Sequence, residues 1–132
     1  VSAVADELWG GRTVGNQIGF ERTRIDIGFP DKEQFEARSL QEKVNELIAG
    51  GGAVTMGFSP RTELLDDPLV RVNMDLIPAH IDMLRVITIE GVDICPCAGT
   101  HVDDIIKIGP LEVTRVRSKG AGKLRVEYIL VD

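Results

Sequence analysis

The carboxyl-terminal stretch constrains the fold more than any other part of the chain. Apolar and polar residues alternate from Leu111 to Arg117 and again from Leu124 to Val131. Between these segments, residues 118–123 read Ser-Lys-Gly-Ala-Gly-Lys, a composition typical of a tight turn. The pattern predicts an antiparallel β-hairpin with one apolar face, and the remainder of the fold must cover that face.

Two segments with helical periodicity can provide this cover. Residues 1–9 place an apolar stripe along one helical face, and a glycine pair follows as a stop signal. A longer helix is expected from about Lys32 to Ala49, with Asp31 and Gln34 as its capping pair. Its apolar face comprises Phe35, Leu40, Val44, Leu47 and Ile48, and three consecutive glycines end it.

Further strands are expected on both sides of the long helix. β-branched or alternating apolar residues occur at 13–19, 20–29, 53–58 and 83–90. The last of these segments is apolar on both faces, which favours a central strand. Residues 69–82 fit either an extended segment or a connecting loop. Together the elements predict a single α+β domain over residues 1–132, with an antiparallel sheet packed against helices.

Size and composition agree with a globular protein of this class. With 132 residues, 14.4 kDa, 43% hydrophobic and 27% charged residues, the chain suits one domain. No apolar run approaches the roughly 20 residues that span a bilayer. Cys95 and Cys97 are separated by one proline, a spacing that disfavours a disulfide between them, so a reducing cytoplasm is the expected location.

The formal net charge of −6 argues against a general nucleic-acid binder, because such proteins depend on neutralising phosphates. The charge is unevenly distributed, however. Residues 110–125 carry five basic residues against one acidic residue, which leaves about +4 there and about −10 elsewhere. A basic edge on an acidic body can guide the end of a nucleic acid. The alternative is a strand pair with solvated charges.

Chemistry-bearing side chains concentrate between Ile94 and Val102. This stretch holds both cysteines of the chain and one of its two histidines. Cys97 and His101 have C-x-x-x-H spacing, and Gly99 between them lets the backbone curl around an ion, so the pair can bind Zn²⁺. Two ligands do not complete a catalytic site, which needs three protein ligands and a water. The alternative is a buried thiol beside a loop histidine that forms hydrogen bonds.

This stretch and its neighbours resemble a known family. The segment from Cys97 to Val102 (Cys-Ala-Gly-Thr-His-Val), Ile108-Gly109-Pro110 and residues 118–125 are similar to the second half of the editing domain of alanyl-tRNA synthetase. They are equally similar to the free-standing AlaX-type proteins that share this domain. Residues 14–19 and 24–29 extend the similarity upstream, so that it covers nearly the whole chain.

The resemblance implies an activity and a cofactor. Members of the family hydrolyse the ester of mischarged Ser-tRNA(Ala) or Gly-tRNA(Ala), and they bind zinc through a C-x-x-x-H pair and an H-x-x-x-H pair on an earlier helix. In this chain the first pair is Cys97 and His101. Threonyl-tRNA synthetase shares the fold, so a relative that edits another amino acid is an alternative, although Gln17 and the Gly-Thr-His-Val loop favour the alanine system.

Other residues take expected roles from the same resemblance. Gln17 matches a polar residue of the amino-acid pocket that favours serine over alanine, and its alternative is a plain polar strand residue. Thr100 is expected to position substrate or water, and Asp93 to accept a hydrogen bond from a metal ligand; either can instead cap its loop. The remaining residues expected to bind substrate at the acceptor end of the tRNA are Gly99, Lys119 and Lys123.

The chain departs from the family at one point. No H-x-x-x-H occurs in it, because the only other histidine is His80. Residues 2–10 resemble the continuation of the helix that carries this pair, so the pair is expected just before Val1, in an amino-terminal segment that the chain lacks. The alternative is loss of the pair, which would leave a non-catalytic metal-binding or tRNA-binding module.

Overall fold

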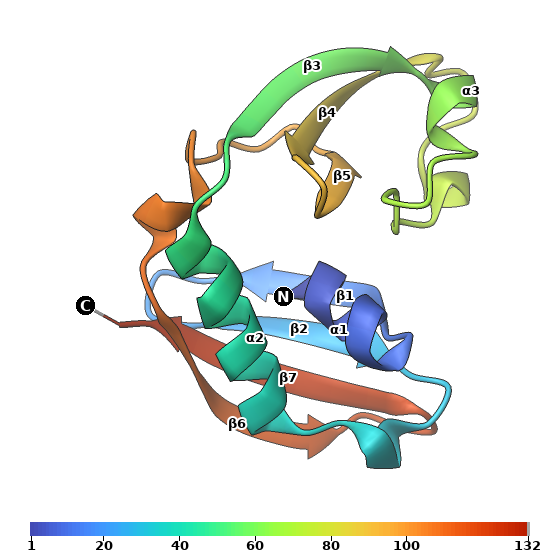
Figure 1. Cartoon of the computed structure of the whole chain (residues 1–132). Helices are drawn as coiled ribbons and strands as arrows, with labels where there is room; N and C mark the ends of the chain where they lie inside the picture. Colours follow the sequence, from blue (N-terminus) through green and yellow to red (C-terminus); the bar gives the residue numbers. More distant parts are fainter. Residues whose placement is uncertain (132) are drawn as a thin grey trace.

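Two antiparallel sheets form the framework of the protein, and the computed structural model describes residues 1–131 (Figure 1). The first sheet has the strand order β1-β2-β7-β6, and the second has the order β3-β4-β5. The strands are β1 Arg12–Ile18, β2 Thr23–Gly28, β3 Val54–Pro60, β4 Met83–Ile89, β5 Asp93–Pro96, β6 Leu111–Ser118 and β7 Lys123–Leu130. The helices are α1 Ser2–Trp9, α2 Ala37–Gly50 and α3 Arg61–Leu64, with 3-10 turns at Lys32–Gln34, Met74–Leu76 and Ile105–Ile108. No helix within residues 1–131 has the length and apolar character of a membrane span.

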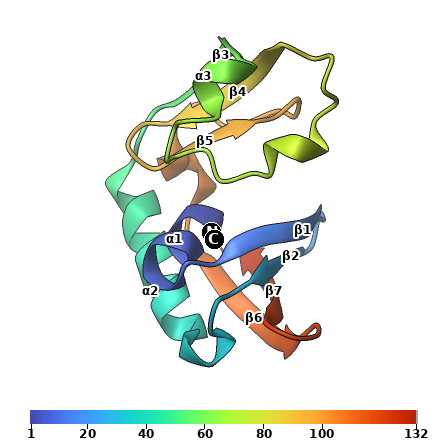
Figure 2. The ribbon, with the colours of Figure 1, turned by 90° about the vertical axis from the view of Figure 1, so that its right-hand side faces the viewer.

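The four-stranded sheet buries one face against α1 and α2, as Figures 1 and 2 show. Ile25 lies opposite Val126 and Ile27 opposite Leu124, so these side chains point to the same face. Ile27, Val126 and Leu40 of α2 are fully buried there. The predicted hairpin is present as β6 and β7, and the predicted α+β class with antiparallel pairing is confirmed.

The three-stranded sheet has a separate and smaller core. Leu84 and Val86 of β4 pack with Leu64 of α3 and with Met74. β4 is the central strand of this sheet, as its two apolar faces predicted. Residues 69–82 form a connecting loop rather than a strand. The Arg61 guanidinium holds this loop, since it donates to the carbonyl oxygens of Met74, Ile77, Pro78 and Ile81 at 3.1, 3.0, 2.6 and 3.0 Å.

The long helix begins later than the sequence predicted. Asp31 caps only a 3-10 turn that ends at Gln34, and the chain is then extended at Phe35 (φ −64°, ψ 134°) before α2 begins. The Phe35 ring packs against the rings of Trp9 and Phe29, with centroid distances of 5.0 and 5.4 Å. Burial of this aromatic cluster outweighs the local helix signals of the segment.

Two chain crossings connect the sheets, and they run side by side. Val54 N donates to Asp103 O at 2.9 Å, and Ile105 N donates to Gly52 O at 3.0 Å. Gly52 N also donates to Asp104 Oδ1 at 3.0 Å. These residues, 52–54 and 103–105, form a hydrogen-bonded neck. The three-stranded sheet is therefore an insertion between α2 and β6 that is attached through this neck.

Truncation of a fully buried side chain should destabilise the protein far more than truncation of an exposed one. Leu40 is 0% exposed, whereas Leu76 is 82% exposed. We expect Leu40→Ala to lower the free energy of unfolding by about 2–5 kcal/mol, because it removes buried methyl groups and leaves a cavity. Leu76→Ala should change it by less than about 0.5 kcal/mol. Urea unfolding followed by circular dichroism measures both, and equal losses would contradict the assigned core.

Candidate functional site

A cavity of about 560 Å³, here called the inter-sheet cavity, lies between the two sheets. Residues of α1, α2 and the four-stranded sheet line it on one side, and the end of β4, the start of β5 and residues 100–102 line it on the other. Most of the lining is apolar. The polar side chains are Ser2, Thr23, Asp93, Thr100, His101 and Tyr128. An apolar cavity with a few polar groups is typical of a small-molecule site.

The loop from Cys97 to His101 is shaped by Arg85 of β4. The Arg85 Nη1 donates to Cys97 O at 2.6 Å and to Gly99 O at 3.0 Å. Gly99 N in turn donates to Cys97 Sγ at 3.4 Å. A side chain at Gly99 would lie 3.6 Å from Cys97 Sγ and 3.9 Å from His101 Cε1. The thiol and the imidazole therefore lie on the same side of the loop.

The hydrogen bond of His101 selects one imidazole tautomer. His101 Nδ1 lies 3.1 Å from Gly99 O. A carbonyl oxygen can only accept, so Nδ1 carries the proton in this contact. In the neutral ring the Nε2 atom then keeps its lone pair, which is the form required for a base or a metal ligand.

Cys97 and His101, the two candidate zinc ligands, lie on one loop and do not complete a zinc site. Within the described residues 1–131, no group of three or more His, Cys, Asp or Glu side chains is arranged to hold a metal ion. A catalytic zinc requires three protein ligands. These two residues therefore do not hold a catalytic zinc by themselves.

The two cysteines differ in their suitability as ligands. Cys95 is half-buried in β5, where it pairs with Ile87 of β4. Burial, together with the neighbouring Asp93 and Cys97, raises the pKa of the Cys95 thiol to about 11. Because the thiolate is the form that binds metals, Cys95 is a poor ligand at neutral pH. Cys97 remains the candidate that the motif predicts.

Asp93 lines the inter-sheet cavity and is engaged in an ion pair. Its Oδ1 accepts from Arg71 Nη1 at 2.8 Å, and Arg71 Nε donates to Asp6 Oδ2 at 2.7 Å. The Arg71 Nη1 also donates to Val92 O at 2.7 Å. The Arg71 side chain is 15% exposed, so this bridge is largely buried. It joins α1, on the first sheet, to β5 of the second, and it fixes the orientation of the Asp93 carboxylate.

Sequence reasoning missed Arg71 and Asp6. The signal that points to Arg71 is its position between two apolar residues, Val70 and Val72, in a segment without clear periodicity. A cation in apolar surroundings needs a carboxylate partner, because an unpaired buried charge is strongly unfavourable. The pattern does not show which carboxylate that partner is.

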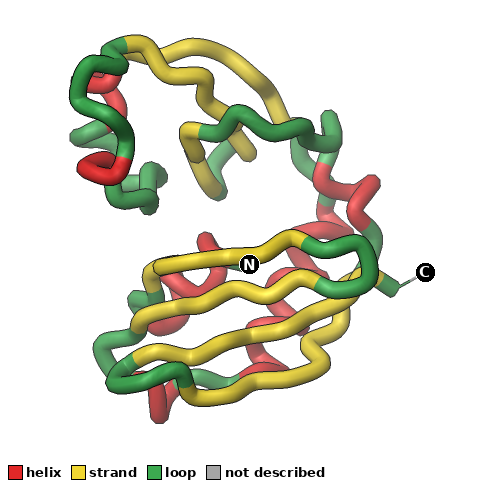
Figure 3. Tube along the Cα trace, turned by 180° about the vertical axis from the view of Figure 1, so that it is seen from behind, coloured by secondary structure: helices red, strands yellow, loops and turns green. Residues whose placement is uncertain are grey.

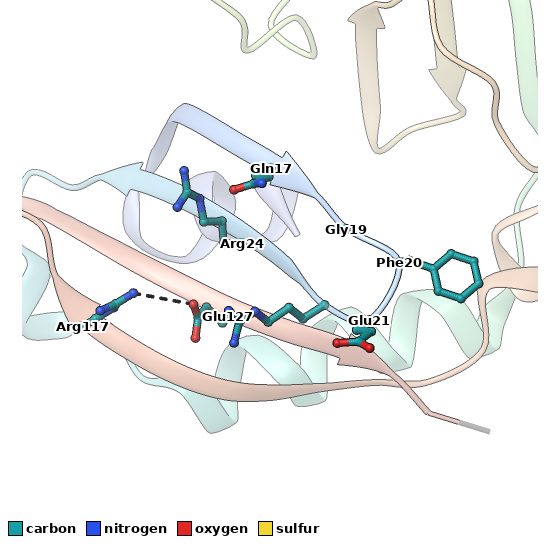
Figure 4. Close-up of a pocket in the computed structure, with 8 residues that line it drawn as sticks. Gln17, Gly19, Phe20, Glu21, Arg24, Arg117 and Glu127 are labelled. Atoms are coloured by element: carbon teal, nitrogen blue, oxygen red, sulfur yellow. Dashed lines mark ion pairs between the residues drawn. The ribbon is translucent and has the colours of Figure 1, made fainter.

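Gln17, expected in the amino-acid pocket, does not line the inter-sheet cavity with Thr100 and His101. Successive side chains of a strand point to opposite faces, and the neighbouring Ile18 lines the inter-sheet cavity. Gln17 instead points to the outer face of the four-stranded sheet, opposite α1 and α2. There it lines a second pocket, which Figure 4 shows.

Lys119 and Lys123 flank the turn of the β6–β7 hairpin, and Lys119 N donates to Lys123 O at 3.0 Å. This turn lies at the end of the sheet away from the second sheet (Figures 1 and 3). From Lys123 to Tyr128, which lines the inter-sheet cavity, strand β7 extends about 17 Å. The two lysine side chains therefore lie well away from the inter-sheet cavity.

Comparison of the sequence with known protein families identifies the kind of domain that this chain resembles. Residues 84–127, from β4 to β7, match the model of the family described as Threonyl and Alanyl tRNA synthetase second additional domain. This match contains Asp93, Thr100 and His101, which line the inter-sheet cavity, together with the Cys97 thiol. Residues 84–127 thus resemble part of a domain of the kind found in these synthetases.

The individual relatives are alanyl-tRNA editing proteins. AlaX-M from Methanosarcina barkeri is 27% identical over 100% of this chain and 55% of its own length. AlaX-M from Saccharolobus solfataricus is 30% identical over 97% of this chain and 53% of its own. The editing protein Aarsd1 from Mus musculus is 32% identical over 93% of this chain and 29% of its own.

These matches confirm the family resemblance that the sequence motifs predicted, and the chain is homologous to alanyl-tRNA editing proteins. The chain spans about half the length of the AlaX-M relatives and less than a third of the length of Aarsd1.

The raised pKa of Cys95 predicts slow and strongly pH-dependent alkylation. In a Cys97→Ser variant, only Cys95 remains. Because raising a thiol pKa to about 11 favours the neutral form, about one molecule in a thousand should carry the thiolate at pH 8. Iodoacetamide labelling followed by mass spectrometry should therefore accelerate about tenfold per pH unit between about pH 8 and 10. Labelling that levels off near pH 9 would contradict the raised pKa, and free N-acetylcysteine serves as the control thiol.

Proposed function

We propose that this chain is the catalytic part of an aminoacyl-tRNA deacylase, which hydrolyses the ester bond of mischarged tRNA(Ala) in trans. Its substrates would be Ser-tRNA(Ala) or Gly-tRNA(Ala). The observation that carries the proposal is the position of Thr100 and His101, from the Cys97–His101 loop, on the wall of the inter-sheet cavity. Homology to alanyl-tRNA editing proteins over nearly the whole chain supports this class of reaction.

The cavity combines apolar walls with a hydroxyl group that an attached serine can meet. Its apolar walls, formed by residues such as Val44 and Ile89, remove bulk water from the neighbourhood of the ester. The Thr100 hydroxyl provides a hydrogen-bond partner for the hydroxyl of an attached serine. An attached alanine would leave that partner unused, which favours hydrolysis of the mischarged species. The His101 Nε2 lone pair is available to accept a proton from water or to bind a metal ion.

We further propose that zinc takes part through Cys97 and His101, with the remaining ligands supplied from outside this chain. Cys97 Sγ and His101 Nε2 would provide two of the ligands, and a zinc ion held there supplies Lewis-acid chemistry when bound. Val1, at the start of α1, lines the same cavity. A histidine pair on an amino-terminal extension of α1 would therefore lie beside the Cys97–His101 loop, which accords with the family resemblance.

The proposed partner is the tRNA, with its acceptor end in the inter-sheet cavity and its body near the basic β6–β7 hairpin. The proposed location is the cytoplasm. Both cysteines are free thiols, which agrees with a reducing compartment.

A second candidate function is a metal-binding or tRNA-binding module without hydrolytic activity. The observation that favours it is the number of candidate ligands. The described residues supply two, whereas a catalytic zinc site needs three protein ligands. The two functions differ in whether mischarged tRNA disappears in the presence of the protein with its natural upstream residues.

The deacylase function predicts that loss of His101 abolishes hydrolysis. Measured on the protein with the natural residues that precede Val1, the initial rate of Ser-tRNA(Ala) hydrolysis should fall by more than about 100-fold in His101→Ala, because the cavity loses its base or metal ligand. Cys97→Ala should lose bound zinc and activity together. The matched controls are His80→Ala and Cys95→Ala, since His80 is exposed and Cys95 is disfavoured as a ligand. Acid-gel separation of charged and uncharged tRNA gives the rates.

The deacylase function would be overturned in favour of the non-catalytic module by one result. In it, the protein, shown by metal analysis to contain zinc, binds Ser-tRNA(Ala) and related mischarged tRNAs but leaves them intact. Equal hydrolysis of Ser-tRNA(Ala) and Ala-tRNA(Ala) would instead overturn the role of Thr100 in discrimination.

The position of the hairpin lysines predicts that they act on whole tRNA and not on its end. Lys119→Ala and Lys123→Ala should each weaken binding of intact tRNA and reduce the slope of log affinity against log salt by about 1, because one phosphate contact is lost. Neither variant should change the affinity for a short RNA that carries only the acceptor end. Fluorescence anisotropy at several salt concentrations measures both, and an equal loss for the short RNA would contradict this assignment.

A further inference from the structure

The pocket that contains Gln17 is separate from the inter-sheet cavity and has its own chemistry. We call it the outer pocket. Its volume is about 450 Å³, and it lies on the outer face of the four-stranded sheet at the tip of the β1–β2 hairpin (Figure 4). Its lining comprises Gln17, Gly19, Phe20, Glu21, Arg22, Arg24, Arg117 and Glu127. Three arginines in one pocket are notable in a chain whose net charge is −6.

Two of these arginines are free to meet a ligand. Arg117 lies 3.8 Å from the carboxylate of Glu127, whose side chain is 7% exposed, so this pair is already formed within the protein. Across residues 1–131, neither Arg22 nor Arg24 has a carboxylate oxygen within 4.0 Å. Guanidinium groups bind phosphate oxygens with two parallel hydrogen bonds. Arg22 and Arg24 therefore offer an unsatisfied anion-binding pair on a pocket wall.

Phe20 adds an aromatic surface at the rim of this pocket. Its ring is fully exposed at the hairpin tip, although leaving a large apolar side chain in water is unfavourable. Figure 4 shows the ring projecting from the turn into solvent, away from the arginine side chains. Exposed aromatic rings and cations on one surface are what proteins use to bind single-stranded nucleic acids, because bases stack on the rings while cations hold the backbone.

The outer pocket and the inter-sheet cavity lie back to back on one end of one sheet. Along β1, Gln17 lines the pocket and Ile18 lines the cavity. Along β7, Glu127 lines the pocket and Tyr128 lines the cavity. Both pairs follow from the alternation of side chains in a strand. A flexible chain that passes around the hairpin tip at Gly19 and Phe20 can therefore occupy both spaces.

We propose that the outer pocket binds single-stranded RNA, namely the unpaired nucleotides that precede the aminoacylated end held in the inter-sheet cavity. Phe20 stacks on a base, and Arg22 and Arg24 bind the neighbouring phosphates. The identity of this RNA as a tRNA acceptor end rests on the proposed function. The pocket itself rests on the contacts of Phe20, Arg22 and Arg24. Because the pocket offers cations on its wall and an exposed aromatic ring at its rim, it fits a nucleotide chain better than an anion without a base.

The test uses a short fluorescein-labelled RNA that ends in CCA-3′ and carries no amino acid. Phe20→Ala should weaken its binding by about tenfold, through loss of base stacking. Arg24→Gln should weaken it several-fold and flatten the dependence of affinity on salt between about 50 and 200 mM. The matched controls are Phe58→Ala, an exposed phenylalanine on the three-stranded sheet, and Arg38→Gln, an exposed arginine on α2. Neither control should change the affinity, and thermal melting verifies that each variant is folded.

The outcomes separate this proposal from the deacylase function. Loss of RNA binding in Phe20→Ala and Arg24→Gln, with both controls unchanged, supports the outer pocket whether or not the protein hydrolyses Ser-tRNA(Ala). Equal binding by all four variants overturns the pocket and leaves the deacylase function standing. AMP or inorganic phosphate that binds as tightly as the RNA also overturns it, because the site would then recognise a mononucleotide or an ion and not a strand.

Discussion

The bridge from Asp6 through Arg71 to Asp93 is the interaction on which the arrangement of the two sheets depends. Its nitrogen to oxygen distances are 2.7 and 2.8 Å, and the three side chains are 15–24% exposed. A largely buried cation between two carboxylates resists separation, since removal of one partner leaves an uncompensated charge. With the neck, this bridge fixes the spacing between the sheets. The inter-sheet cavity exists because that spacing keeps α1 opposite the Cys97–His101 loop.

Much of the fold follows from local patterns in the sequence. Alternation predicted the β6–β7 hairpin, and the two apolar faces of residues 83–90 predicted the central strand β4. Local patterns do not record which strands pair, so the division into two sheets instead of one was not predicted. The start of α2 was misplaced for a related reason, because the packing of Phe35 on Trp9 is a long-range contact.

The candidate site combines residues that the sequence groups locally with residues whose position depends on the folded geometry. The spacing of Cys97 and His101 suffices to place both on one side of a single loop. Gln17 illustrates the opposite case. Thr13 pairs with Ile27 on the covered face, and strict alternation would bring Gln17, four residues later, to that same face. The β-bulge between Thr13 and Gly15 reverses the alternation, so Gln17 points outward. Gly15 marks this strand as irregular, but it does not specify which face Gln17 takes.

The neck gives the molecule two cooperative units of unequal strength. The core of the four-stranded sheet holds ten buried apolar residues, whereas that of the inserted sheet holds four. Local opening costs the least free energy where the fewest buried contacts are lost. The inserted unit, residues 53–104, should therefore open as a block while β1, β2, β6 and β7 stay paired. Its amide hydrogens would then exchange with solvent earlier than those of the larger sheet, and the wall that carries Thr100 and His101 would belong to the more readily opened unit.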